Sequence, residues 1–236
     1  MRIGRFLIVI LMFTTPLWSQ ALYYLEQENR IENPHQQESK TILQKVWYAK
    51  DKMKTEDPQT VTIIRLDLNK IWILNPAEKT YMEMQLEDLE AMGQLALGML
   101  GNTEDLKPVV TRTGKEKKYG QWKASELRIQ MGPVTQRLWI SREVDFPLDY
   151  YKQTLKAMPS LKQISQLLEK EVDGIPVYTE STMEIMGTRV SSSTELIKVE
   201  RLPSLPGDFF DLPEGYTKIL NPVQQIQQRM RGMQQK

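Results

Sequence analysis

Few residues in this sequence could carry out covalent chemistry. The 236 residues include no cysteine and a single histidine, His35. A cysteine nucleophile is therefore excluded, and a histidine-dependent triad or a zinc site would have to be built around that one residue. Because His35 follows Pro34 in a predicted polar loop, we expect an exposed histidine without a catalytic or metal-binding role.

Carboxylates are the remaining candidates for acid–base catalysis. Asp67 with Glu83, and Glu180 with Glu184, could form pairs of the kind that glycosidases use. Carboxylates on the polar face of a strand are ordinarily solvated, and the spacing does not separate an active-site pair from a wet surface. No GxGxxG or GxxxxGKS/T loop precedes a predicted helix. We therefore predict a protein that is not an enzyme and binds no metal or cofactor.

The first residues have the pattern of a cleavable export signal. A basic start at residues 1–5 is followed by an apolar run over residues 6–13, and Ser19 and Ala21 supply small side chains three residues and one residue before a cut. We predict a signal peptide over residues 1–21. The alternative is an uncleaved anchor, but the apolar run is much shorter than the roughly 20 residues that cross a bilayer. The mature chain is predicted to be soluble and periplasmic, and without cysteine it is not a lipoprotein.

The charge of the mature chain gives no reason to expect nucleic acid binding. Removal of residues 1–21 takes away two of the 31 basic residues and none of the 30 acidic ones. Nucleic acid binding draws its affinity from clustered Lys and Arg, and a chain with 29 basic and 30 acidic side chains has no such excess. We expect no nucleic acid partner.

Strand-like alternation dominates the chain, and two segments have helical periodicity. Short turns between consecutive strands predict an antiparallel meander, because a parallel pair needs a long crossover. Apolar residues at helical spacing predict helices over residues 86–100, with Gly101 as the stop, and over residues 148–171, the second split or kinked at Pro159. The expected strands cover residues 23–30, 41–55, 60–68, 71–74, 80–84, 109–113, 122–131, 135–141, 175–185 and 190–199.

The C-terminal part is expected to be less regular. Residues 203–216 are rich in Pro and Gly and include Phe209 and Phe210, which predicts an extended arm that packs on the domain. Asn221 and Pro222 resemble a helix cap followed by proline at the first helical position. Residues 221–236 are therefore expected to form either a polar, frayed tail or a short helix that binds a membrane or a partner.

Residues 53–84, with the run ILNPAEKTYMEM at 73–84, resemble the bacterial exported domain-of-unknown-function proteins of the LolA/LolB-like superfamily, the outer-membrane lipoprotein carriers. Residues 120–124 and 210–216 extend the resemblance over most of residues 22–220. It implies one α+β domain over residues 22–220, in which a strongly curved antiparallel sheet forms an incomplete, half β-barrel that two or three helices cover. In the carriers that give the superfamily its name, the cavity under such helices holds the acyl chains of lipoproteins.

These observations favour a periplasmic, non-enzymatic carrier for an apolar ligand, such as a lipid or a lipoprotein acyl chain. The alternative is an envelope protein-interaction module with a packed core, which would contact a membrane periphery or an envelope protein. We expect a monomer. The candidate cavity residues could equally fill a dry core, and they are Trp47, Ile64, Leu66, Trp72, Met92, Met99, Trp139 and Met158.

Overall fold

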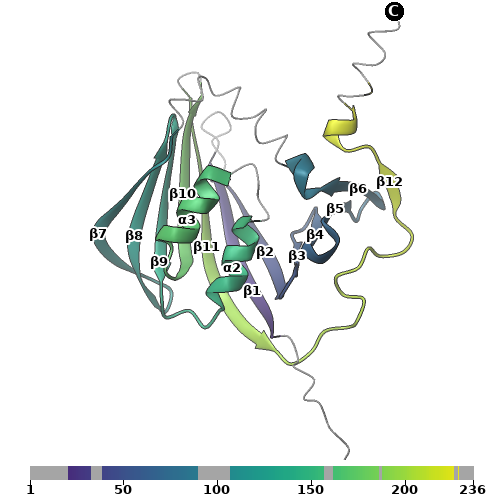
Figure 1. Cartoon of the computed structure of the whole chain (residues 1–236), viewed down its shortest axis with the longest axis horizontal. Coiled ribbons are helices and arrows are strands. Elements are labelled where there is room, and N and C mark those ends of the chain that lie inside the picture. The colour runs from purple at the N-terminus through teal and green to yellow at the C-terminus, as the bar shows by residue number, and fades with distance from the viewer. Residues whose placement is uncertain are drawn as a thin grey trace, which may run out of the picture.

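Most of the chain forms one large, curved sheet that does not close into a barrel (Figure 1). The computed structural model describes residues 21–32, 39–89, 107–156, 162–185, 188–225 and 228. Twelve strands lie in these ranges, in the sheet order β12-β6-β5-β4-β3-β2-β1-β11-β10-β9-β8-β7. They are β1 (Leu22–Glu32), β2 (Ser39–Ala49), β3 (Lys52–Glu56), β4 (Val61–Arg65), β5 (Lys70–Asn75), β6 (Thr80–Gln85), β7 (Val109–Tyr119), β8 (Trp122–Met131), β9 (Val134–Ser141), β10 (Ile175–Ile185), β11 (Thr188–Leu202) and β12 (Thr217–Ile219).

The sheet consists of two antiparallel meanders, β1 to β6 and β7 to β11, which join where β1 pairs with β11. The short β12 then adds to β6 in parallel. The described helices are α2 (Leu148–Lys156), α3 (Lys162–Glu171) and the 3-10 turn η1 (Leu66–Leu68). The predicted curved, incomplete barrel agrees with this open sheet. The described residues form a mostly β structure with few helices. This agrees with a β-rich fold, which is a broader class than the α+β class predicted from the sequence.

Helices α2 and α3 pack against the same face of the sheet, which we call the inner face (Figure 1). Tyr23 of β1 lies opposite Tyr48 of β2, and the ring of Phe146 contacts both at centroid distances of 5.2 and 5.0 Å. Tyr150 of α2 adds an edge contact to Tyr23 at 6.0 Å. On β8 and β9, Leu127 and its neighbours pack under Leu155 of α2 and Leu168 of α3. Apolar burial on this face therefore fixes both helices.

The opposite, outer face of β2 to β5 is covered by the C-terminal arm, residues 203–216. Phe210 is buried against Ile63 and Trp72, and Phe209 lies 5.4 Å from the ring of Trp47. The prediction that this arm packs on the domain is confirmed. The sheet of the first meander thus has apolar side chains on both faces, with different segments packed against each.

One predicted strand is two strands in the structure. Residues 41–55 were expected to form one long strand, but β2 ends at Ala49 and β3 begins at Lys52, so that Tyr48 lies opposite Met53. The two-residue turn at Lys50 and Asp51 contains no glycine, proline or asparagine that would mark it. That prediction was wrong because alternation alone does not report a tight turn between hairpin strands.

The three predicted helix starts in the described ranges are confirmed, and the start at Leu148 is that of α2. A helical turn begins at Leu86, and its Leu86 and Leu89 pack on the inner face. Near the C-terminus, Asn221 accepts a hydrogen bond from the backbone N–H of Gln224, and Gln224 Oε1 accepts one from the Asn221 N–H in return. This reciprocal cap starts a helix at Pro222. Within the described ranges, no helix has the length and apolar content that a membrane span requires.

Candidate ligand-binding face

The inner face of the first meander carries two adjacent rows of mainly apolar side chains. The first row crosses β3 to β6 and consists of Met53, Ile64, Ile71 and Met84, which the strand registers place side by side. Leu86 and Leu89 pack on this row. The second row contains Ile73, Met82 and Ile219, because Ile73 pairs with Met82 and Met82 with Ile219 of β12. A hollow lies at each end of this surface.

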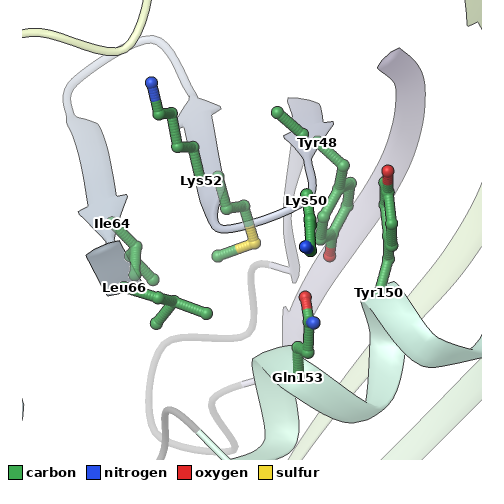
Figure 2. Close-up of a pocket in the computed structure, with 9 residues that line it drawn as sticks. Tyr48, Lys50, Lys52, Ile64, Leu66, Tyr150 and Gln153 are labelled. Atoms are coloured by element: carbon green, nitrogen blue, oxygen red, sulfur yellow. The ribbon is translucent and has the colours of Figure 1, made fainter. Parts of the chain in front are cut away.

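The first hollow is a narrow pocket between the β2–β3 turn, η1 and α2 (Figure 2). Met53, Ile64 and Leu66 form its apolar side, and Tyr48, Lys50 and Gln153 form the other. The volume of the pocket is about 10 Å³. Sites for whole small molecules usually enclose about 300–1,000 Å³. This pocket therefore has room for about one water molecule.

The polar side of the pocket contains an unsatisfied buried group. Gln153 Oε1 is buried and accepts no hydrogen bond, and it is the one such side-chain atom among the described residues. Figure 2 shows Gln153 rising from α2 toward Lys50 and Tyr48. The pocket has room for about one water molecule beside this oxygen, which is enough to donate to it.

The second hollow is a wider groove at the far end of the same rows. It runs from the β3–β4 loop past the β5–β6 turn to Ile219, and Ile73 and Met82 line its apolar part. The volume of this groove is about 520 Å³. Ile219 is 42% exposed and the following Leu220 46% exposed. Large apolar side chains left in water beside a groove are typical of a surface that binds an apolar partner.

An ion pair fixes the β12 side of this groove. Glu83 on the outer face of β6 accepts hydrogen bonds from Lys218 Nζ at 2.8 Å and from the Trp72 indole at 2.9 Å. The hydrogen bond from Lys218 is the largest influence, followed by that from Trp72, and together they lower the pKa of Glu83 to about 2. The ionised Glu83 therefore holds Lys218, and with it β12, on the edge of the sheet at neutral pH.

The structure places two of the eight candidate cavity residues at a hollow. Ile64 and Leu66 line the narrow pocket. Trp47 and Trp72 lie on the outer face against Phe209 and Phe210, apart from the pocket. Trp139 is buried in the second meander, 5.5 Å from the ring of Tyr119. The other three, Met92, Met99 and Met158, lie outside the described residues, as does His35.

The carboxylates considered for catalysis have structural partners. Asp67 accepts two hydrogen bonds from Arg65, at 2.8 and 2.7 Å, whereas Glu83 binds Lys218 and Trp72. Glu180 binds Arg137 at 3.0 Å. Within the described part of the chain, no group of three or more His, Asp or Glu is arranged to hold a metal ion. Each of these three carboxylates is therefore accounted for by an ion pair.

Sequence reasoning missed the polar side of the pocket. Tyr48, Lys50 and Gln153 come from a strand end, a turn and a helix more than one hundred residues further along the chain. The one feature of the sequence that could have indicated this part of the pocket is Lys-Asp-Lys at residues 50–52. Consecutive charged residues between two alternating segments are compatible with a hairpin turn.

Residues 28–216 match the family described as "Domain of unknown function (DUF4412)". No curated protein matches the sequence. Among solved structures, PNGF-II is similar at 12% identity and a TM-score of 0.42, over 87% of this chain and 32% of its own, so this chain spans about a third of that protein.

Two shorter proteins match over most of their own length. An uncharacterised conserved protein from Thermus thermophilus has 10% identity and a TM-score of 0.49, over 86% of this chain and 92% of its own. A putative outer membrane lipoprotein-sorting protein domain from Vibrio parahaemolyticus has 15% identity and a TM-score of 0.36, over 80% and 89%. At these identities the likeness concerns the fold alone.

Proposed function

The chain belongs to the family described as Domain of unknown function (DUF4412), and we propose that it is a non-enzymatic binding or carrier protein for an apolar ligand, such as a lipid or a lipoprotein acyl chain, in the bacterial envelope. The proposal includes membership of the LolA/LolB-like superfamily and export to the periplasm through the predicted signal peptide. Residues 22–220 form its binding domain.

The observation that carries this proposal is the inner face of the first meander. Its apolar rows end in two hollows, and Ile219 and Leu220 are still 42% and 46% exposed at the wider one. Burial of apolar surface contributes about 25 cal/mol for each Å² removed from water. Burial of the apolar surface of this groove under an acyl chain would therefore favour binding without any covalent step.

The direct test is native mass spectrometry of the protein purified from the periplasm without detergent. We expect a bound mass that solvent extraction removes and that lipid analysis identifies. If the purified protein has only the mass of the polypeptide, and vesicles or free fatty acid added at high concentration leave it unchanged, the carrier proposal fails.

A pair of leucines in η1 provides a matched test of the site. Leu66 lines the pocket and packs against Ile64, whereas Leu68 is 46% exposed two residues later. Leu66→Asp places a charge in the apolar side of the pocket and should lower retention of the bound mass at least tenfold. Leu68→Asp carries the same charge on the same turn and should retain the ligand. Equal retention by both variants would show that the pocket is not part of the site.

A second candidate function is that of an envelope protein-interaction module. The exposed Ile219 and Leu220 directly precede the helix that begins at Pro222, so this edge could bind a protein instead of a lipid. Deletion of residues 222–236 tests this function. Loss of an envelope partner from crosslinked pull-downs, in a protein that carries no lipid, would favour the module over the carrier.

A further inference from the structure

Strand β7 forms one end of the sheet, and β12 forms the other (Figure 1). Among the described strands, β7 pairs with β8 alone, from Val109 to Tyr119, with a bulge between Arg112 and Glu116. In an edge strand, alternate residues point their backbone N–H and C=O groups away from the neighbouring strand. The outer edge of β7 therefore presents backbone donors and acceptors with which a further strand could pair.

This edge is strongly basic, although the chain as a whole is nearly neutral. Of the 29 basic and 30 acidic residues after residue 21, seven basic and two acidic ones lie in residues 107–128, so that 22 and 28 are left for the rest. All seven basic residues are exposed. Of the two carboxylates, Glu126 is buried and binds Arg137, and Glu116 binds Lys123 at 2.8 Å. The β7 end of the sheet therefore has a local excess of positive charge.

Two lysines lie directly opposite each other near the end of the β7–β8 hairpin, Lys118 on β7 and Lys123 on β8. Like charges in such a position destabilise a strand pair. Glu116 binds Lys123, but Lys118 forms no ion pair with a carboxylate in the described ranges. Both lysines line a hollow of about 580 Å³, together with Lys117 and with Glu143, which binds the backbone N–H of Lys123. A carboxylate that another molecule places in this hollow would relieve the repulsion.

The charges select the kind of molecule that could pair with β7. A second copy of the chain would bring its own lysines against Lys115, Lys117 and Lys118, and lysines on an edge strand are a common means of preventing such pairing. An anionic membrane would attract the lysines but has no backbone groups for the edge, and the lipid groove lies at the β12 end of the sheet. A polypeptide with carboxylate side chains fits both features.

We propose that β7 binds an extended, acidic segment of another protein, which joins the sheet as a further strand. The backbone of this segment pairs with the outer edge of β7, and its Asp or Glu side chains bind Lys117 and Lys118. The bulge between Arg112 and Glu116 interrupts the regular spacing of the backbone groups, so the segment pairs mainly with the residues that follow the bulge. This interaction requires neither the lipid nor the groove at β12.

The test measures the binding of three labelled peptides of equal length to the full-length mature protein by fluorescence anisotropy. In the first, Glu alternates with Val and Thr. The second has the same residues but is N-methylated at every backbone amide, so it keeps the charges and loses the donors. The third has Lys in place of Glu. We expect the first to bind at least about tenfold more tightly than the second, because several backbone hydrogen bonds are lost, and the third not to bind.

Two double variants test the place of binding. Lys117→Gln with Lys118→Gln should weaken the first peptide about fivefold, as expected for two exposed ion pairs. Lys40→Gln with Lys170→Gln removes the same charge from exposed positions of β2 and α3 and should leave the affinity unchanged. Because all four side chains are exposed, neither double variant should change the melting temperature appreciably, and this measurement excludes misfolding.

Three outcomes would overturn the proposal. Equal affinity for the first two peptides would mean that β7 attracts charge without pairing as a strand, and equal weakening in both double variants would mean that net charge alone matters. Binding to phosphatidylglycerol vesicles without binding to any peptide would assign the edge to a membrane. None of these results bears on the carrier function, since lipid occupancy by native mass spectrometry should be the same in both double variants.

Discussion

The guanidinium of Arg65, at the end of β4, donates a hydrogen bond to the carboxylate of Asp211, 146 residues further along the chain. Arg65 also binds both oxygens of Asp67, so a single side chain joins η1 to the C-terminal arm. The Arg65 side chain is 11% exposed and Asp211 is 54% exposed. The arm is thus held by one largely buried cation in addition to the packing of Phe209 and Phe210.

Replacement of Arg65 should therefore loosen the arm. We expect Arg65→Met to lower the free energy of unfolding by about 1–3 kcal/mol, because it leaves Asp67 without its bidentate partner, and Asp211→Asn by about 0.5 kcal/mol. Urea denaturation measures both. Arg30→Met is the control, since Arg30 and Glu32 form a 3.8 Å pair with both side chains more than half exposed. A loss for Arg30→Met as large as for Arg65→Met would contradict the role assigned to Arg65.

Acid should weaken the attachment of β12. The pKa of Glu83 lies at about 2 in the folded protein and near 4.5 when it is unperturbed, so Glu83 stabilises the fold above about pH 4.5. This contribution is lost as the pH falls from 4.5 toward 2. At pH 7, Glu83→Gln should cost on the order of 1–2 kcal/mol after allowance for solvent screening, and the difference from wild type should vanish near pH 2.

Urea denaturation of both proteins between pH 2 and pH 7 measures this dependence. Glu78→Gln, in the exposed β5–β6 turn, removes a carboxylate without a described ion pair and should change stability by less than about 0.5 kcal/mol. A Glu83→Gln difference that stays constant over the whole pH range would contradict the prediction.

The second meander contains an ion pair with a buried carboxylate, which should be sensitive to the loss of its cation. The Glu126 side chain is fully buried and accepts hydrogen bonds from Arg137 at 2.6 Å and Thr113 at 2.7 Å. Burial favours the neutral acid, but these hydrogen bonds outweigh it and lower the pKa of Glu126. Arg137→Met should therefore cost about 3–5 kcal/mol, because it leaves a charge buried without its cation.

The neighbouring Arg128 is the natural control for this prediction. It lies opposite Arg137 in the β8–β9 register but is exposed, so Arg128→Met should cost less than about 0.5 kcal/mol. The double variant Arg137→Met with Glu126→Leu should recover much of the loss, because it removes both charges. Thermal unfolding compares all three. A double variant as unstable as Arg137→Met would mean that packing, and not charge, determines the cost.

A separate prediction concerns the binding of an acyl chain in the groove beside β12. Ile219 lies in the groove and Ile197 lies in β11 away from it, and both are exposed, at 42% and 47%. If the acyl chain extends into the groove, Ile219→Asp should reduce the bound lipid at least fivefold, while Ile197→Asp should not. Neither should change the unfolding midpoint appreciably, since both side chains already contact water. Native mass spectrometry gives the occupancy, and an equal loss in both variants would remove the groove from the site.

Local patterns predicted most of the sheet and the helix starts, because alternation and capping act within a few residues. The same patterns failed at residues 41–55, where Lys50 and Asp51 turn the chain without glycine, proline or asparagine. Strand β7 also continues to Tyr119, beyond the predicted end at residue 113. Gly114 has a φ of 72° and lies in a β-bulge there. The strand continues through the bulge, although glycine in a sequence usually indicates the end of a strand.

The candidate site was harder to predict because it depends on which face of the sheet each segment covers. Once the turn at Asn69 fixes the β4–β5 register, Ile64 pairs with Ile71, and Trp72 must point to the opposite face. The sequence places both Trp72 and Ile64 among the candidate cavity residues because both side chains are apolar. The assignment of the outer face to the C-terminal arm, and of Gln153 to the pocket, depends on contacts between residues more than one hundred positions apart, which no short pattern contains.

The pairing of β1 with β11 has a consequence for how the chain reaches its native state. Leu22 lies opposite Leu202, so β1 cannot pair with its second neighbour until the chain is available as far as residue 202. Contacts this far apart in sequence slow folding, since the loop between them must close first. If the chain is exported from its N-terminus, as proposed above, this central strand pair cannot form until residue 202 has crossed the membrane. The topology of the sheet would then keep the first strand unpaired on this side during translocation.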